Sequence, residues 1–280
     1  MTRFPSHGQP LDSRGVAEAA DLLGVRAAVL WAIVTVETAG CGFLPDRRPV
    51  ILFERHEFRR RTAGRFDASH PELSGPPGGY GVPGVHQHGR LAAAMRLDIR
   101  AAIESASWGL GQLMGCNAAL AGHADAQAMA EQFRRSENAQ LVGMARFIRS
   151  RGLDKHLRQG SWAAFARGYN GPNFGINRYD AKLGQQAAHF AANPPPDLTV
   201  RAIQLLLSYQ GFAPGRVDGR VGEQTRRAIA AFRSANLLGE GGGHDGLLVE
   251  LLRRLPADAD APDRSPVRSP TLSSAATGGG

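Results

Sequence analysis

Apolar side chains repeat at helical spacing along much of this chain, and one short helix is marked especially clearly. In residues 25–39 the apolar positions share one face of a helix, and Glu37 continues that face. The apolar members of the face are Val29, Leu30, Ile33 and Val34. Gly40 stands where a left-handed residue would end the helix. The pattern predicts an apolar helix with one carboxyl group in its last turn.

The expected surroundings of Glu37 favour a protonated carboxyl group. Its apolar neighbours and the unsatisfied carbonyl groups at the end of the helix both disfavour negative charge. A carboxyl group that stays protonated near neutral pH can donate a proton to the leaving oxygen of a sugar. The alternative is that Glu37 points into solvent at a fraying helix end.

A second segment, residues 107–115, surrounds one aromatic and one amide side chain with glycine. Glycine permits close backbone approach and unusual dihedral angles, which suits the wall of a groove. Trp108 could stack on a sugar ring, and Gln112 could hydrogen-bond to hydroxyl or acetamido groups. The alternative for Trp108 is burial in the hydrophobic core.

A third segment, residues 166–172, ends a predicted helix with a tyrosine and an asparagine. Gly171 and Pro172 follow the pair and should stop the helix. Tyr169 and Asn170 would then project from a rigid element. Alternatively, Asn170 forms only a local turn with its neighbours.

Together with residues 51–56, these three segments resemble the phage-endolysin type of N-acetylmuramidase, in the lysozyme-like superfamily. The resemblance covers roughly residues 12–190. It implies a mainly α, lysozyme-like catalytic domain that hydrolyses the β-1,4 bond between N-acetylmuramic acid and N-acetylglucosamine, with Glu37 as general acid and no cofactor. It also implies a sugar groove lined by Trp108, Gln112, Tyr169 and Asn170.

The second carboxylate of such a site has two candidates. Asp46 lies in a polar loop after Glu37, at a spacing similar to that of the second carboxylate in other lysozymes. Glu54 follows the β-prone run 50–53 and should be held near the end of a strand. Asp46 could instead be a turn former with arginine partners, and Glu54 a structural ion-pair partner. The sequence leaves this choice open.

After a proline linker at residues 191–197, a new helical pattern begins and predicts a small three-helix domain over residues 198–255. Residues 200–204 and 217–225 resemble the common peptidoglycan-binding domain. The resemblance implies wall binding through Asp218, Gly219 and Thr225. Residues 256–280 are rich in Pro, Ser, Ala and Gly, a composition that predicts disorder.

Metal and cysteine chemistry find little support in the sequence. The chain has nine His, but the run after His56 lacks a second His four positions on, and the histidines of the 70–89 loop are a weak ligand cluster. Cys41 and Cys116 are far apart and form neither a redox motif nor a disulfide framework. We therefore expect no metal.

Charge and composition narrow the choice of partner. The 280 residues, 42% of them hydrophobic, suffice for one ordinary domain and one small one, and the formal net charge is +8. A basic protein would be drawn to the anionic bacterial wall or to nucleic acid. No nucleic-acid-binding motif accompanies the charge, so we expect the protein to bind peptidoglycan and no nucleic acid. We also expect a monomer.

No apolar run is long enough to predict a membrane span, and residues 1–10 lack the apolar core of a signal peptide. We expect synthesis in the cytoplasm and action on the periplasmic wall after release by another factor.

Two rival functions stay open. One is a lytic transglycosylase, which needs only one glutamate and leaves anhydro-muramic ends. The other is a wall-binding protein without catalytic activity.

Overall fold

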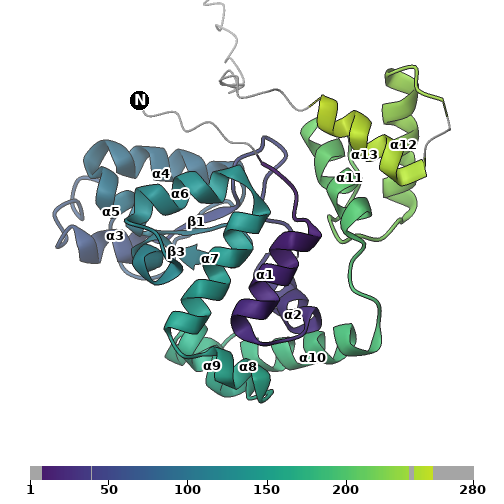
Figure 1. Cartoon of the computed structure of the whole chain (residues 1–280). Coiled ribbons are helices and arrows are strands. Elements are labelled where there is room, and N and C mark those ends of the chain that lie inside the picture. Colours follow the sequence, from purple (N-terminus) through teal and green to yellow (C-terminus); the bar gives the residue numbers. More distant parts are fainter. Residues whose placement is uncertain (1–7, 39, 240–242, 255–280) are drawn as a thin grey trace, which may run out of the picture.

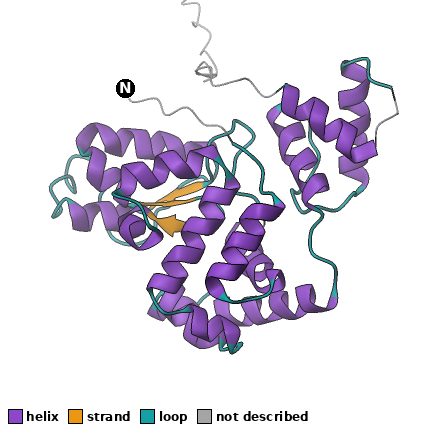
Figure 2. Cartoon of the chain, viewed as in Figure 1, coloured by secondary structure: helices purple, strands orange, loops and turns teal. Residues whose placement is uncertain are grey.

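The computed structural model describes residues 8–38, 40–239 and 243–254, and these form a mainly helical protein with one small sheet (Figures 1 and 2). The mainly α architecture with a second, small helical domain, as expected from the sequence, is confirmed. The tail expected to be disordered, residues 256–280, lies outside the described residues.

The first two helices pack into the larger domain. Helix α1 (Ser13–Leu23) begins at Asp12, whose side chain accepts hydrogen bonds from two backbone N–H groups, and ends at Gly24 in the left-handed conformation. Helix α2 (Ala27–Thr38) is apolar on nearly every face. Such a helix must be buried, and α2 packs against α10 (Tyr179–Ala192) and α1.

Three short strands form the sheet in the order β1-β2-β3. Strand β1 (Ile51–Phe53) pairs antiparallel with β2 (Ala106–Trp108), with Ile51 opposite Trp108. Strand β2 then pairs antiparallel with β3 (Leu113–Met114). The second predicted segment, residues 107–115, is therefore a tight hairpin together with the loop that closes it.

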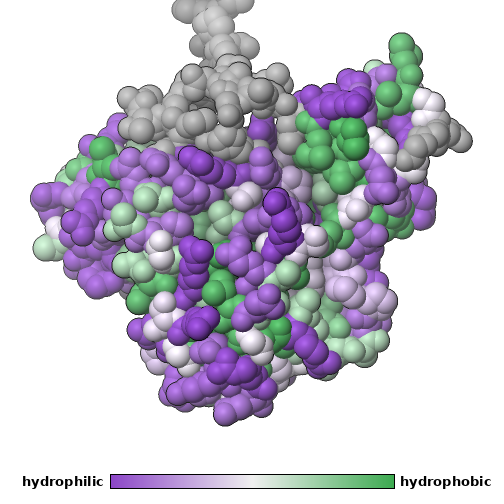
Figure 3. All heavy atoms as spheres, in the orientation of Figure 1, coloured by the Kyte–Doolittle hydropathy of each residue, from purple (hydrophilic) through white to green (hydrophobic). Residues whose placement is uncertain are grey.

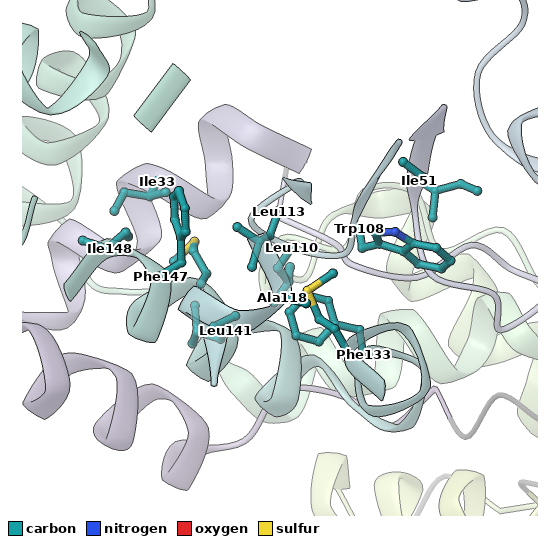
Figure 4. Close-up of a cluster of buried hydrophobic side chains, with 14 of the residues drawn as sticks. Ile33, Ile51, Trp108, Leu110, Leu113, Ala118, Phe133, Leu141, Phe147 and Ile148 are labelled. Atoms are coloured by element: carbon teal, nitrogen blue, oxygen red, sulfur yellow. The ribbon is translucent and has the colours of Figure 1, made fainter. Parts of the chain in front are cut away.

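The remaining helices of the larger domain surround the sheet and the core. They are α3 (Arg55–Arg61), α4 (Val85–Leu97), α5 (Ile99–Glu104), η1 (Gly115–Ala121), α6 (Ala126–Arg135), α7 (Glu137–Ser150), α8 (Asp154–Arg158), α9 (Trp162–Asn170) and η2 (Pro172–Gly175). The buried apolar residues of the larger domain form one continuous core that includes Ile33, Phe133 and Phe147 (Figure 4). Hydrophilic residues cover much of the visible face of this domain (Figure 3).

Helix α10 ends at Ala192, and an extended segment leads to the C-terminal module, which we define as residues 198–254 (Figure 1). The module contains α11 (Leu198–Tyr209), α12 (Glu223–Ala235) and α13 (Gly243–Arg253), the three helices that the apolar pattern predicted. These helices have a small core of their own, which includes Ile203, Phe232 and Leu251.

Within the described ranges, no single helix is long and apolar enough to cross a membrane. The bent pair α1 and α2 passes that test together, by length and composition only.

Candidate active site

Glu37 lies in the last turn of α2, where the helical pattern predicted it. Gly40 follows with a φ of 97°, the positive value expected of a glycine at the end of a helix. Burial raises the pKa of Glu37 from its ordinary value of 4.5 to about 7, although a hydrogen bond from Tyr179 favours the charged form and lowers it. Loss of water is thus the larger effect, and the carboxyl group is partly protonated at neutral pH.

Two tyrosines from different helices face the Glu37 carboxyl group. The hydroxyl of Tyr179, at the start of α10, donates a hydrogen bond to Oε1 of Glu37. Burial and then the nearby Glu37 charge raise the pKa of both Tyr179 and Tyr169 well above its ordinary value. Both hydroxyl groups therefore stay protonated, and the Tyr179 hydroxyl acts as a neutral donor to the carboxyl group.

Tyr169 joins α9 to the glycine-rich hairpin loop. Its hydroxyl donates to the carbonyl of Gly111 at 2.6 Å, and its ring stacks on Phe165 with centroids 5.1 Å apart. On the other side of the loop, the hydroxyl of Thr38 donates to the carbonyl of Leu110 at 3.3 Å. The end of α2, the glycine-rich loop and the end of α9 therefore meet, so the structure brings the three sequence segments together.

Gln112 supports this loop from within. Its backbone has a φ of 44°, a strained value for a residue with a side chain. Its amide oxygen accepts from the Ser107 hydroxyl at 2.8 Å, and its amide nitrogen donates to the carbonyl of Gly109 at 2.9 Å. The side chain is half-buried. Its hydrogen bonds hold the loop in shape, and its expected contact with sugar stays a prediction.

The expectation that Trp108 lines the sugar groove is wrong for this structure. The indole is 3% exposed and packs in the core of the larger domain, as Figure 4 shows. Its Nε1 donates to the carbonyl of Ile103 at 3.3 Å. The reason is its position on the central strand β2, where a large apolar side chain is covered by the surrounding helices. The alternative of a core tryptophan is the correct one.

Asn170 is exposed at the last position of α9. It is followed by Gly171, whose φ is 88° and which ends the helix as the sequence predicted. The side chain therefore remains open to solvent beside the Tyr169 turn. Its expected contact with substrate stays a prediction.

The two candidates for the second carboxylate have different surroundings. Asp46 accepts from Nη2 and Nε of Arg48 at 2.5 and 2.8 Å and is 37% exposed, in the arrangement of a surface ion pair. Glu54 follows β1 directly and is 17% exposed, with Oε2 lying 3.2 Å from Nδ1 of His56. Burial raises the pKa of Glu54, while His56 lowers it. Only Glu54 is held in a protected position.

Family comparisons agree with this geometry. Residues 26–191 match the family model described as N-acetylmuramidase, and residues 197–240 match one described as a peptidoglycan binding domain. The first match spans more than half of the chain. The chain belongs to the N-acetylmuramidase family. It is a glycosidase that acts on peptidoglycan.

A solved structure supports the same assignment. The muramidase resembles the crystal structure of the Burkholderia AP3 phage endolysin, with a TM-score of 0.60 and 36% sequence identity. The likeness covers 66% of this chain and 72% of the endolysin chain. The comparison with curated proteins found no match.

Tyr179 is the site residue that the sequence analysis of this muramidase missed. It lies 142 residues from its partner Glu37 and is 5% exposed. The sequence gives only a faint signal for its role. Of the four Tyr in the chain, two lie ten positions apart here, and Tyr179 is the first residue of α10. No local pattern could have connected it to Glu37.

In the C-terminal module, the residues proposed for wall binding are used to build the module itself. The Gln204 amide oxygen accepts from the backbone N–H groups of Asp218 and Gly219 at 3.0 and 2.8 Å. Its nitrogen donates to the Thr225 hydroxyl at 3.1 Å. Thr225 is 2% exposed and donates onward to the carbonyl of Pro214. The expectation that Thr225 contacts the wall is therefore wrong for this structure, because its hydroxyl group is buried and already bonded.

The structure also bears on metal and cysteine chemistry. In the described part of the chain, no group of three or more His, Cys, Asp or Glu lies close enough together to hold a metal ion. Both cysteines are free. Burial raises the pKa of the Cys41 thiol to about 12, which keeps it an unreactive thiol at neutral pH.

Proposed function

We propose that Glu37 is the general acid of this muramidase and protonates the β-1,4 bond between N-acetylmuramic acid and N-acetylglucosamine. The observation that carries the proposal is a half-buried carboxyl group at the end of α2 that accepts a hydrogen bond from Tyr179 and whose pKa is raised by loss of water to about 7. General acids work best when their pKa lies near the operating pH, because the protonated form is then abundant and still gives up its proton.

The hydrogen bond from Tyr179 indicates which oxygen delivers the proton. Because Oε1 of Glu37 already accepts from the Tyr179 hydroxyl, the transferable proton belongs on Oε2. When that proton moves to the glycosidic oxygen, the bond from this oxygen to the anomeric carbon breaks, and Glu37 becomes a carboxylate. Tyr179 then stabilises the new negative charge, and the carboxylate can later accept a proton from an attacking water molecule.

For the second carboxylate we propose Glu54 over Asp46. Asp46 is neutralised by two hydrogen bonds from Arg48 at the surface. Glu54 is fixed at the end of β1 by its backbone N–H, which donates to the carbonyl of Ser105 at 2.9 Å. Strand β1 pairs with β2, which leads into the loop held by Tyr169. Glu54 is thus anchored to the same rigid frame as the acid.

The proposal for Glu37 is tested by digesting purified peptidoglycan with the intact protein and with Glu37→Gln, followed by mass spectrometry of the released fragments. A matched control is Glu18→Gln, because Glu18 is 54% exposed and its partner Arg146 lies 3.6 Å away. We expect reducing muramic ends from the wild type and the control, and a loss of release of about 10²–10⁴-fold with Glu37→Gln. Full activity of Glu37→Gln would exclude it as the acid.

The same products distinguish the rival reactions. Anhydro-muramic ends would identify a lytic transglycosylase, and no release by the wild type would identify a protein that only binds the wall.

For the second carboxylate, we expect Glu54→Gln to lower the rate and Asp46→Asn to leave it within about twofold, since surface ion pairs contribute little. Equal activity of both variants with wild type would argue against a hydrolase with two carboxylates.

We further propose that the protein acts as a monomer on the periplasmic wall, reached after release by another factor, and does not bind nucleic acid. The peptidoglycan binding domain match supports the wall as its partner. Sedimentation analysis with and without added DNA would test the monomer and the absence of nucleic-acid binding.

A further inference from the structure

An ion pair joins the C-terminal module to the larger domain. Arg201 of α11 donates from Nη1 and Nη2 to the two carboxylate oxygens of Glu137, at 2.5 and 2.6 Å. Glu137 is the first residue of α7, and both side chains are 0% exposed. Figure 1 shows the two helices in different parts of the molecule, α7 in the larger domain and α11 in the module. The pair is therefore buried in the contact between the two.

Both members of this pair also hold the turn that follows Glu37. The carboxylate of Glu137 accepts from the backbone N–H of Gly42 at 2.8 Å and from that of Leu11 at 2.9 Å. Arg201 donates from Nε to the carbonyl of Gly40 at 3.1 Å, and Nη2 bonds to the same carbonyl. Gly40 and Gly42 are thus fixed by a side chain from the module and by its partner.

A second side chain of α7 extends this hydrogen-bond network to the glycine-rich hairpin loop in residues 107–115. Gln140 lies one turn after Glu137 and is 0% exposed. Its oxygen accepts from the backbone N–H of Leu110 at 2.9 Å, and its nitrogen lies 3.4 Å from the carbonyl of Gly42. A Cβ at Gly42 would lie 1.9 Å from the Gln140 oxygen, so a larger residue there would displace the Gln140 amide group. Helix α7 thereby ties the turn after α2 to the glycine-rich loop.

The module also touches the catalytic helix directly. The guanidinium carbon of Arg201 lies 5.8 Å from the centre of the Trp31 ring, and Trp31 belongs to α2 and is 4% exposed. A further contact is the Tyr209 hydroxyl of α11, which donates to the carbonyl of Gly8 at 2.8 Å. The module is therefore docked against the larger domain through several contacts of α11.

Stability alone does not explain why Arg201 is buried with Glu137. Burying a charged pair gains little stability over an apolar pair, because both ions lose their water. Here each carboxylate oxygen and each of the three guanidinium nitrogens has a partner. What such a pair supplies is direction, since the planar guanidinium binds the carboxylate and the Gly40 carbonyl in one fixed geometry.

We propose that Arg201 is a positioning residue for catalysis, so that the wall-binding module completes the active site of the domain it is attached to. The guanidinium group fixes the Gly40–Gly42 turn and rests against α2, and in this way it holds Glu37 at its place beside Tyr179. This inference rests on the proposed role of Glu37. This role of the module differs from anchoring, because an anchor raises only the local concentration of the enzyme at the wall.

The test uses a substrate that needs no anchoring. The turnover number, KM and pH profile are measured on a soluble oligosaccharide of alternating N-acetylglucosamine and N-acetylmuramic acid, with the full chain throughout. The variants are Arg201→Gln, Arg201→Lys and a matched control, Arg227→Gln. Arg227 lies on α12 of the same module, is 76% exposed and forms a surface ion pair with Glu223. All assays are run where circular dichroism shows each variant to be folded.

We expect Arg201→Gln to lower kcat at least tenfold with KM within twofold, and Arg227→Gln to match the wild type. Arg201→Lys should fall between them, because lysine keeps the charge but not the planar fork. The alkaline limb of the kcat profile should also move to lower pH in Arg201→Gln, since a looser site admits water to Glu37. The groups that face Glu37, Tyr179 of α10 and Tyr169 of α9, are unchanged in these variants.

Three outcomes would overturn the proposal. One is a folded Arg201→Gln with the kcat and pH profile of the wild type. A second is an effect confined to insoluble peptidoglycan, which would make the module an anchor only. A third is the failure of both Arg201 variants to fold, which would assign the pair to stability alone. Glu37→Gln in the same assay separates the two proposals, because its full activity would refute the role of Glu37 whatever the Arg201 variants do.

Discussion

Two glutamates of this muramidase, the half-buried Glu37 and the fully buried Glu137, differ in what surrounds them, and the difference decides their chemistry. Glu37, at the end of α2, receives one hydrogen bond from the neutral Tyr179 hydroxyl, and its pKa rises to about 7. Glu137, at the start of α7, receives a guanidinium group and two backbone N–H groups. The first carboxyl group can exchange a proton near neutral pH, whereas the second is committed to holding chain segments together.

The positions of the two glutamates in their helices reinforce this contrast. Glu137 lies in the first turn of its helix, where the dipole favours negative charge. Glu37 lies in the last turn, where the dipole opposes it. The same residue type is therefore placed at opposite ends of a helix dipole, beside a neutral hydroxyl group in one case and beside a guanidinium group in the other.

The largest effect is expected from breaking the structural pair. Glu137→Leu leaves the Arg201 charge buried without its partner and should lower the free energy of unfolding by about 3–5 kcal/mol. The double variant Glu137→Leu with Arg201→Met should recover much of this loss, because no charge then remains buried. Urea unfolding at pH 7 measures both. A double variant no more stable than the single one would show that the hydrogen bonds to Gly40 and Gly42 dominate.

Glu37 should show the opposite behaviour, because replacing its carboxyl group is expected to stabilise the protein at alkaline pH. The folded pKa of Glu37, about 7, lies above its ordinary value of 4.5, so the stability it contributes is lost as pH rises from about 4.5 through about 7. Glu37→Gln avoids this loss and should be more stable than wild type by about 1–3 kcal/mol at pH 8, with no gain at pH 4. Urea unfolding at the two pH values tests this, and an equal gain at both would contradict it.

A smaller change is expected from the hydroxyl group that faces Glu37. The hydrogen bond from Tyr179 lowers the pKa of Glu37, so Tyr179→Phe should raise that pKa and move the alkaline limb of the activity profile up by as much as about one pH unit. The rate on soluble substrate as a function of pH measures the shift. Movement to lower pH would mean that Tyr179 acts mainly by excluding water.

The smallest effect is expected at the surface carboxylate. Asp46→Asn removes an exposed ion pair with Arg48 and should change the free energy of unfolding by less than about 1 kcal/mol, and by less still in 1 M salt. Unfolding curves at low and high salt test this. A large loss at both salt concentrations would mean that Asp46 has a structural role that its exposure does not suggest.

Local patterns in the sequence predicted several elements well. Helix α2 with Glu37 in its last turn, strand β1 and the helix that ends at Asn170 all follow from the spacing of apolar residues and from the stop signals after them. The three helices of the C-terminal module follow in the same way. Each of these features depends on residues within a few positions of one another, so the sequence displays them directly.

The side-chain roles were predicted less well, and the reason is the same in each case. Trp108 and Thr225 carry groups that suit sugar binding, but whether they reach solvent depends on distant elements that cover them. Gln112 has the donors and acceptor expected of a sugar ligand, yet the hairpin itself uses them. A side chain's chemistry is local, whereas its exposure is set by packing.

The sequence by itself determined that this chain contains an apolar helix ending in an acid, a glycine-rich loop, a Tyr-Asn helix end and a second helical module. Only the tertiary structure decided which groups meet: Tyr179 reaches Glu37 across 142 positions, and Arg201 reaches Glu137 across 64. Periodicity encodes which face of a helix is apolar, because that depends on neighbouring residues. Hydrogen bonds between distant helices depend on how those faces pack, and this packing gives Glu37 the surroundings that raise its pKa to about 7.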